Sequence, residues 1–179
     1  MRHLPNILTA LRLLSMPVIV WLMVSGRFQA AFWVFAVSSV TDAVDGAIAR
    51  LFDARTRLGQ WLDPLADKVM LVGVYVTLGI QSQVPLWLVV LVVLRDVLIV
   101  LYALVYVLAG SFDTSPLLIS KINTAAQITL AGVVLAHLGQ GWGGPRLAEA
   151  FQYVVAATTV GSAAAYLMAV GRRGPPAEG

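Results

Sequence analysis

Four aspartates stand at helical spacing within one short stretch, residues 42–67. Asp42 and Asp45 are three residues apart, and Asp63 and Asp67 are four apart. On a helix each pair shares one face, so two helices that meet here can direct four carboxylates into one cavity. Carboxylates at close range do not all stay ionised without cations. Oxygen ligands with no Cys or His nearby suit Mg²⁺ or Mn²⁺, so the stretch predicts a site for divalent cations.

Ion pairing is the competing interpretation of these acidic residues. Arg12, Arg50 and Arg95 are the available basic partners, but they are few and dispersed along the chain. Ionisable groups inside apolar segments are functional candidates by default. We therefore favour a two-metal site, in which two divalent cations hold a diphosphate and stabilise a leaving phosphate.

The composition of the chain indicates a protein that crosses a membrane several times. Of its 179 residues, 59% are hydrophobic and 12% are charged, and the mean hydropathy is +0.85. These values are too apolar for a soluble domain. The absence of cysteine excludes disulfides and thiolate metal sites. A net charge of +3 fits basic residues gathered on a cytoplasmic face better than a surface that binds nucleic acid.

The elements that must position the aspartates are long apolar helices. Six stretches are long enough to cross the hydrocarbon, and they cover residues 5–25, 28–50, 60–80, 84–109, 116–138 and 147–170. Their short links predict an all-α, up-and-down bundle that forms one transmembrane domain over residues 1–170, with a cytoplasmic tail at 171–179. Gly59 is expected to make a tight turn before the third helix.

Basic and aromatic residues set the expected orientation in the membrane. Arg27 and Arg146 would lie on the outer side, close to an interface marked by Trp21, Trp87 and Trp142. The richer, cytoplasmic side would hold Arg2, Arg50, Arg55, Arg57, Lys121, Arg172 and Arg173. Both termini and the aspartate cluster are therefore expected near the cytoplasmic face. The membrane would be a bacterial inner (cell) membrane, or the mitochondrial inner membrane in a eukaryote.

Written out, the stretch from Asp42 to Asp67 reads D-x2-D-G-x2-A-R-x8-G-x3-D-x3-D without a departure. This pattern resembles the signature of the CDP-alcohol phosphotransferases, integral membrane enzymes of phospholipid synthesis. Fixed residues at fixed spacing make a specific signal. Three further stretches, PNILTALRLLSMPV, RDVLIV and ISKINTAAQ, resemble the eukaryotic-type cardiolipin synthases of that family.

The resemblance implies a reaction and roles for the aspartates. Enzymes of this type transfer a phosphatidyl group from CDP-diacylglycerol to phosphatidylglycerol and release CMP. Asp42, Asp45 and Asp63 would bind the metals, and Asp67 would be a ligand or the general base that takes the proton of the acceptor hydroxyl. No activated Ser, Cys or His nucleophile is evident, so we expect direct displacement at the β-phosphorus of the donor. A homodimer among membrane lipids is carried over by resemblance.

Several positions are candidates for contact with the CDP-diacylglycerol donor. They are Asn6, Thr9, Gly46, Ala49, Arg50, Thr56 and Gly59. Each also has a simpler role open to it. Gly46 and Ala49 suit helix packing, Arg50 suits anchoring at the membrane interface, and Asn6 suits helix capping.

Three basic residues, Arg12, Arg95 and Lys121, are candidates for binding the acceptor. Arg95 and Asp96 are neighbours, so we expect their side chains to point to different sides of the helix. Lys68 is expected to extend toward the membrane interface.

Other functions compete with cardiolipin synthesis. Phosphatidylglycerophosphate synthases, which use glycerol 3-phosphate, often carry Arg-Glu and Gly-Lys where this chain has Arg95-Asp96 and Ser120-Lys121. These differences favour the cardiolipin synthase. A cation transporter would place acidic groups along the full membrane depth and show inverted repeats, and neither pattern is found in the sequence. A structural lipid-binding protein would tolerate Asp67→Asn.

Overall fold

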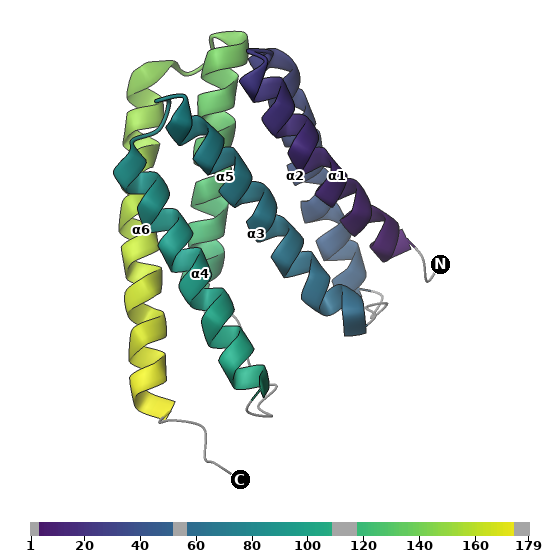
Figure 1. The fold of residues 1–179 in the computed structure, drawn as a ribbon, viewed down its shortest axis with the longest axis vertical. Helices are drawn as coiled ribbons and strands as arrows, with labels where there is room; N and C mark the ends of the chain where they lie inside the picture. Colours follow the sequence, from purple (N-terminus) through teal and green to yellow (C-terminus); the bar gives the residue numbers. More distant parts are fainter. Residues whose placement is uncertain (1–3, 52–56, 109–117, 174–179) are drawn as a thin grey trace.

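The computed structural model describes residues 4–51, 57–108 and 118–173, and it describes side chains for residues 14–41, 68–101 and 118–168. Within these ranges the chain forms helices and no strand. They are α1 (Leu4–Val24), α2 (Phe28–Leu51), α3 (Arg57–Ile80), α4 (Leu86–Leu108), α5 (Leu118–Gln140) and α6 (Gly144–Arg173). They run alternately up and down (Figure 1). The all-α class and the order of the helices predicted from the sequence are confirmed.

The turn predicted at Gly59 is wrong. The third helix begins at Arg57, so Gly59 lies inside its first turn. A glycine inside a helix costs only about 1 kcal/mol relative to alanine, which the rest of a long helix can outweigh. At the other end of the chain, α6 continues to Arg173 and so includes the start of the stretch predicted as a tail.

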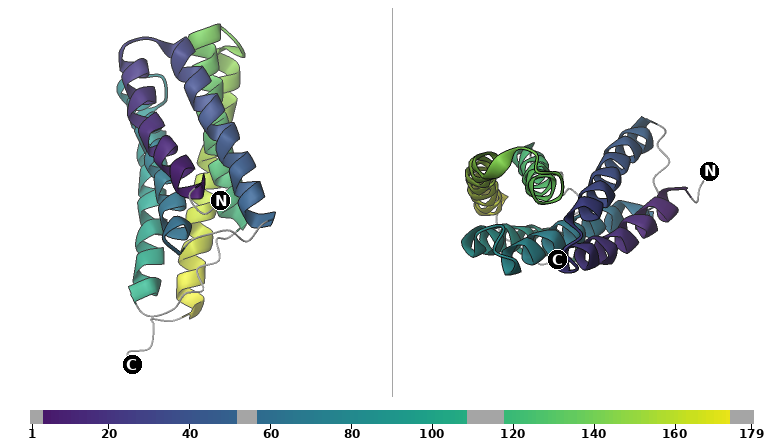
Figure 2. Two further views of the ribbon diagram at one scale, coloured as in Figure 1. Left: turned by 90° about the vertical axis from the view of Figure 1, so that its right-hand side faces the viewer. Right: turned by 90° about the horizontal axis from the view of Figure 1, so that it is seen from above.

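The helices α3 and α5 each contact three other helices and lie at the centre of the packing. α5 contacts α2, α3 and α6, while α1 contacts α2 and α3, and α4 contacts α3 and α6. The helices lie close together at the upper end of Figure 1, and α1, α2 and α3 lean away from α4 and α6 toward the lower end. The view from above shows the same divergence (Figure 2). The helix ends that carry the aspartate stretch therefore lie at the lower, more open end of the bundle.

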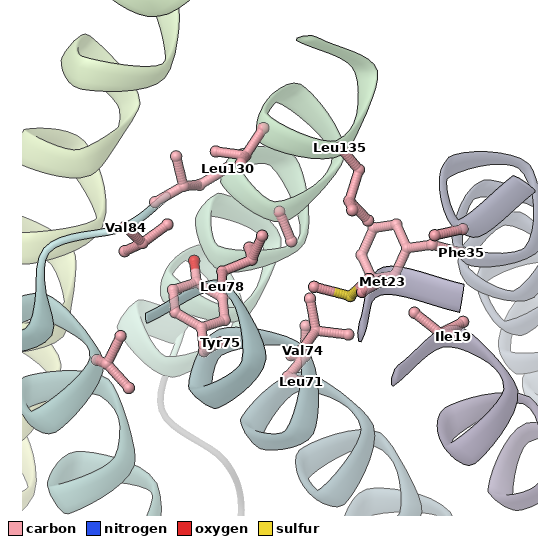
Figure 3. Packing of buried hydrophobic residues seen from close by; sticks show 14 of the residues in the cluster. Ile19, Met23, Phe35, Leu71, Val74, Tyr75, Leu78, Val84, Leu130 and Leu135 are labelled. Carbon is pink, nitrogen blue, oxygen red and sulfur yellow. The ribbon is translucent and has the colours of Figure 1, made fainter. Parts of the chain in front are cut away.

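The buried core takes residues from all of these helices, α1 to α6. Ile19 and Met23 of α1 meet Leu71 and Val74 of α3, with Phe35 of α2 beside them (Figure 3). All five side chains are buried. In a bilayer such packing stabilises the bundle mainly through van der Waals contact, because lipid tails are as apolar as the side chains. The core thus fixes how α1 and α3 sit against each other.

The links at the upper end are tight. Gly26 closes α1 with a φ of 71°, and the amide of Arg27 donates to the carbonyl of Leu22 at 2.8 Å. This is the hydrogen-bond pattern of a Schellman cap, for which glycine is the usual residue because it has no Cβ. Ser82 adopts the same left-handed conformation after α3, with a φ of 57°. Such caps turn the chain back at once and keep the bundle antiparallel.

The surface is apolar, as the composition predicts. Within the described part of the chain, α5 is the helix that is long and apolar enough to cross a membrane, and shorter apolar stretches occur at Leu14–Val24, Phe28–Thr41 and Lys68–Ile80. Trp21, Trp87 and Trp142 are each more than half exposed, and they lie near the end of α1, at the start of α4 and in the link between α5 and α6. The six predicted membrane crossings stay a prediction.

Candidate active site and the polar network beside it

The aspartates fall on two consecutive helices. Asp42 and Asp45 lie in the second half of α2, and Asp63 and Asp67 lie in the first half of α3. Because the helix is continuous through each pair, the backbone register puts the two members of a pair on one helix face. The four side chains lie outside the described ones. The helical placement of the pairs is therefore confirmed, and their convergence on metal ions stays a prediction.

The predicted donor contacts belong to three neighbouring helices. Asn6 and Thr9 lie in α1, as does the acceptor candidate Arg12, and α1 contacts both α2 and α3. Gly46, Ala49 and Arg50 lie in α2, and Gly59 lies in α3. Thr56 falls outside the described residues, as do the side chains of the others. The fold thus makes neighbours of the helices that carry these positions, and their contacts with a donor stay predictions.

Arg95 is hydrogen-bonded through all three nitrogens of its guanidinium group. Its side chain is 1% exposed. Its Nη2 donates to the hydroxyl of Ser120 on α5 at 2.7 Å and to that of Ser162 on α6 at 2.6 Å. Its Nη1 donates to Oδ1 of Asp96, and its Nε to Ser162 at 3.1 Å. Arg95 therefore joins α4 to α5 and α6.

The expectation that Arg95 and Asp96 point to different sides of α4 is wrong, because the two side chains form an ion pair. Both residues are buried. An unpaired charge in the interior is costly, and this cost outweighs the local helical geometry that separates adjacent side chains. Burial therefore explains why the long arginine side chain folds back onto its neighbour.

Lys68 of α3 binds the same carboxylate as Arg95 does. Its Nζ donates to Oδ1 of Asp96 at 2.7 Å, and its side chain is 20% exposed. The expectation that Lys68 extends to the membrane interface is wrong, because a buried carboxylate on α4 offers it a closer partner. Oδ1 of Asp96 accepts from both cations, while Oδ2 is buried and has no hydrogen-bond partner in the described part of the chain. We call Lys68, Arg95, Asp96, Ser120 and Ser162 the α3–α6 network.

Lys121, the other described acceptor candidate, is exposed at the start of α5. It follows Ser120, which is bonded to Arg95. Arg95 thus lies inside the bundle and contacts the residue that precedes Lys121, while Lys121 itself lies at the surface.

A second polar group lies farther along α5. Asn123 is fully buried, and its Oδ1 accepts hydrogen bonds from Thr158 at 2.8 Å and Thr159 at 2.9 Å. The Tyr75 hydroxyl donates to the carbonyl of Gln127 at 3.0 Å. Ser120, Asn123 and Gln127 follow one another at helical spacing, so they form a polar stripe on α5. In the sequence this stripe is visible only as polar residues spaced three and four positions apart in an otherwise apolar stretch.

The chain matches the family model of the CDP-alcohol phosphatidyltransferases over residues 2–166. It therefore belongs to this family, and the family predicted from the aspartate pattern is confirmed.

Two relatives carry the name cardiolipin synthase (CMP-forming). The human protein of that name is 36% identical over 151 residues, which cover 74% of this chain and 50% of the human one. A cardiolipin synthase (CMP-forming)/mitochondrial hydrolase fusion protein of Schizosaccharomyces pombe is 35% identical over 180 residues, or 91% of this chain and 30% of the fusion protein.

A third relative is named for a different acceptor. The chloroplastic CDP-diacylglycerol–glycerol-3-phosphate 3-phosphatidyltransferase 1 of Oryza sativa subsp. japonica is 33% identical over 184 residues. These cover 92% of this chain and 56% of the rice protein. The chain thus spans from 30% to 56% of the length of these three relatives.

Proposed function

We propose that this chain is a cardiolipin synthase, which transfers a phosphatidyl group from CDP-diacylglycerol to the headgroup hydroxyl of phosphatidylglycerol and releases CMP. The observation that carries the proposal is the aspartate pattern, which lies on two consecutive helices of a chain that belongs to the CDP-alcohol phosphatidyltransferase family. The names of the human and fission yeast relatives support this choice of acceptor.

The proposed setting is a bundle of six membrane-spanning helices whose site faces the cytoplasm. Each helix has at least 21 residues, which is about the length needed to cross the hydrocarbon. Ile80, Leu86 and Leu118 are more than two thirds exposed, as suits side chains that face lipid. Cytoplasmic placement would let a water-soluble nucleotide leave while the lipid substrates enter sideways. A homodimer stays a proposal by resemblance.

The donor set suits a pair of divalent cations, Mg²⁺ or Mn²⁺. Four carboxylates supply only oxygen, which such hard ions prefer. Asp42 and Asp45 on α2, with Asp63 and Asp67 on α3, would hold the ions, and both helices pack on α1. When bound, the ions would screen the charge of the diphosphate and stabilise the leaving CMP.

The protein's own residues would carry the rest of the reaction. Asp67 would take the proton of the acceptor hydroxyl. The hydroxyl oxygen then bonds to the β-phosphorus, the bond from that phosphorus to the bridging oxygen breaks, and CMP leaves. Arg50 would bind donor phosphate with its guanidinium fork, while Gly46 and Ala49 let the nucleotide approach α2 closely.

The acceptor residues differ in how readily they could meet a ligand. Lys121 is exposed and can meet the phosphate of an acceptor directly. Arg95 is already bonded to Asp96, Ser120 and Ser162, so an acceptor phosphate would have to replace one of the serine hydroxyls. Arg12 lies in α1, beside the helices of the aspartates. We therefore propose Lys121 as the first contact of the acceptor.

A panel of acceptors tests the proposal. Purified protein would receive radiolabelled CDP-diacylglycerol, a divalent salt, and either phosphatidylglycerol, glycerol 3-phosphate or inositol phosphate. Labelled cardiolipin is the expected product. Phosphatidylglycerophosphate would establish the alternative that the rice relative favours. Metal flux into vesicles without CMP release would overturn the enzyme assignment and favour a transporter.

A further inference from the structure

The α3–α6 network ends on the residue that directly follows the proposed general base. Lys68 comes immediately after Asp67 in α3, and its amine binds Asp96 on α4 at 2.7 Å. We propose that Lys68 and Asp96 are positioning residues, which fix the rotation of the α3 turn that carries Asp67. This inference rests on the proposed function for the role of Asp67.

The contact is anchored well beyond the two helices that it joins. Asp96 is held by Arg95, and Arg95 is held in turn by Ser120 of α5 and Ser162 of α6. A turn of α3 is thereby tied to three other helices. Each link is a hydrogen bond that involves a charged group, and such bonds are shorter and stronger than those between neutral groups.

Burial distinguishes this pair from an ordinary surface ion pair. The Asp96 side chain is 3% exposed and that of Lys68 is 20% exposed. Exposed pairs are screened by solvent and contribute little, whereas a pair whose carboxylate is buried is screened much less. Oδ1 of Asp96 accepts from both cations, while Oδ2 has no hydrogen-bond partner among the described residues. Lys68 is therefore kept close to α4.

The geometry of a helix shows how much this can matter for catalysis. Side chains extend about 5–6 Å from the helix axis, so a rotation of about 10° moves a side-chain group by about 1 Å. A displacement of about 1 Å can lower the rate of a positioned reaction by about 100-fold. The Lys68–Asp96 contact, one residue from the proposed base, is thus placed to control turnover.

Substitution of Lys68 is the sharper test, because Asp96→Asn would also deprive buried Arg95 of its counter-ion. Lys68→Met removes the contact and keeps the Arg95–Asp96 pair. Lys68→Arg keeps a cation that can reach Asp96. Arg27→Met is the matched control, because it removes a positive charge at the opposite end of the bundle, where Arg27 lies 5.7 Å over the ring of Trp21.

We expect Lys68→Met to lower kcat about 10- to 100-fold while the KM for CDP-diacylglycerol stays within about twofold. Lys68→Arg and Arg27→Met should stay within about threefold of the wild-type kcat, as expected when the ion pair or the site is left intact. Titration with Mn²⁺ followed by electron paramagnetic resonance gives a second readout. Its Kd should rise about tenfold in Lys68→Met alone, as for other residues that orient metal ligands.

Wild-type turnover and Mn²⁺ binding in Lys68→Met would overturn the inference. An equally large loss of turnover in Lys68→Arg and Lys68→Met would also overturn it. Lys68→Arg keeps a cation beside Asp96, so such a loss would mean that turnover depends on the lysine amine itself and not on the ion pair. If Mn²⁺ binding follows the expected order but no acceptor gives a product, the proposed function fails and the positioning role stands. Thermal unfolding in detergent identifies any variant whose loss comes from misfolding.

Discussion

Asp67 is the residue to which the proposed mechanism assigns the proton of the acceptor. Asp67→Asn keeps the size of the side chain and removes its basicity. We expect turnover to fall by about 100- to 10,000-fold, the range that a positioned base contributes, while donor binding is retained. CMP release and equilibrium binding of CDP-diacylglycerol measure the two effects. Glu149→Gln, an exposed carboxylate of α6, serves as the control. Wild-type rates in Asp67→Asn would exclude the base assignment.

The divalent cations can be tested by removing them. If four carboxylates hold the ions, strict chelation should abolish turnover, because the diphosphate charge is then unscreened. Readdition of Mg²⁺ or Mn²⁺ should restore it, and Ca²⁺, a larger ion, should restore less because it prefers more ligands at longer distances. CMP release after dialysis against chelator is the measurement. Turnover that persists at full chelation would contradict the two-metal proposal.

At the scale of residues, the sequence was informative where the relevant partners are close along the chain. The spacing of Asp42 and Asp45 indicates a shared helix face, and α2 is continuous through both. The partners of Asp96 could not be predicted in the same way. Lys68 is 28 positions from it, and Ser162 is 67 positions from Arg95. Such contacts depend on how the helices pack, which residue spacing does not specify.

At the scale of helices, the close packing of α5 against α2 depends on Gly139 of α5. A Cβ on Gly139 would stand 2.7 Å from the backbone N and Cα of Gln29 in α2. Backbone atoms cannot move aside as a flexible side chain can, so Gly139→Ala should destabilise the fold by about 1–3 kcal/mol. Thermal unfolding in detergent is the measurement.

The same helix provides the control. A Cβ on Gly132 would meet Phe35 at 3.9 Å, which is ordinary van der Waals contact. Gly132→Ala should therefore leave the fold unchanged or stabilise it by about 0.5–1 kcal/mol, since alanine is the better helix former. Equal unfolding temperatures for the two variants would show that α2 and α5 do not approach this closely.

The helices themselves were largely predictable, because long apolar stretches separated by short polar links define them. Their ends were less so. The sequence placed the start of the third helix near residue 60, since Gly59 favours a turn, yet the helix begins at Arg57. The preference of Gly59 for a turn was outweighed by the stability of the long helix that contains it. The approach of Gly139 to α2 was equally hidden, because a small residue in an apolar helix also suits many other positions.

At the scale of the whole molecule, the orientation can be tested with single cysteines, because the chain has none of its own. Gln83→Cys lies exposed in the link between α3 and α4, at the predicted outer end. Ala177→Cys lies in the predicted cytoplasmic tail. An impermeant maleimide should label the first in intact cells and both in permeabilised cells. Labelling of Ala177→Cys in intact cells would reverse the topology.

The hydroxyl partners of Arg95 have a consequence for how the chain is made. Ser162 follows Arg95 by 67 positions, so at about 5–20 residues per second the ribosome needs about 3–13 s to supply it. Until then the adjacent Asp96 is available as the counter-ion of the Arg95 guanidinium. A chain cut short before α6 would leave Arg95 without the two hydrogen bonds that Ser162 accepts from it. The last helix to be synthesised therefore completes the hydrogen bonding of Arg95.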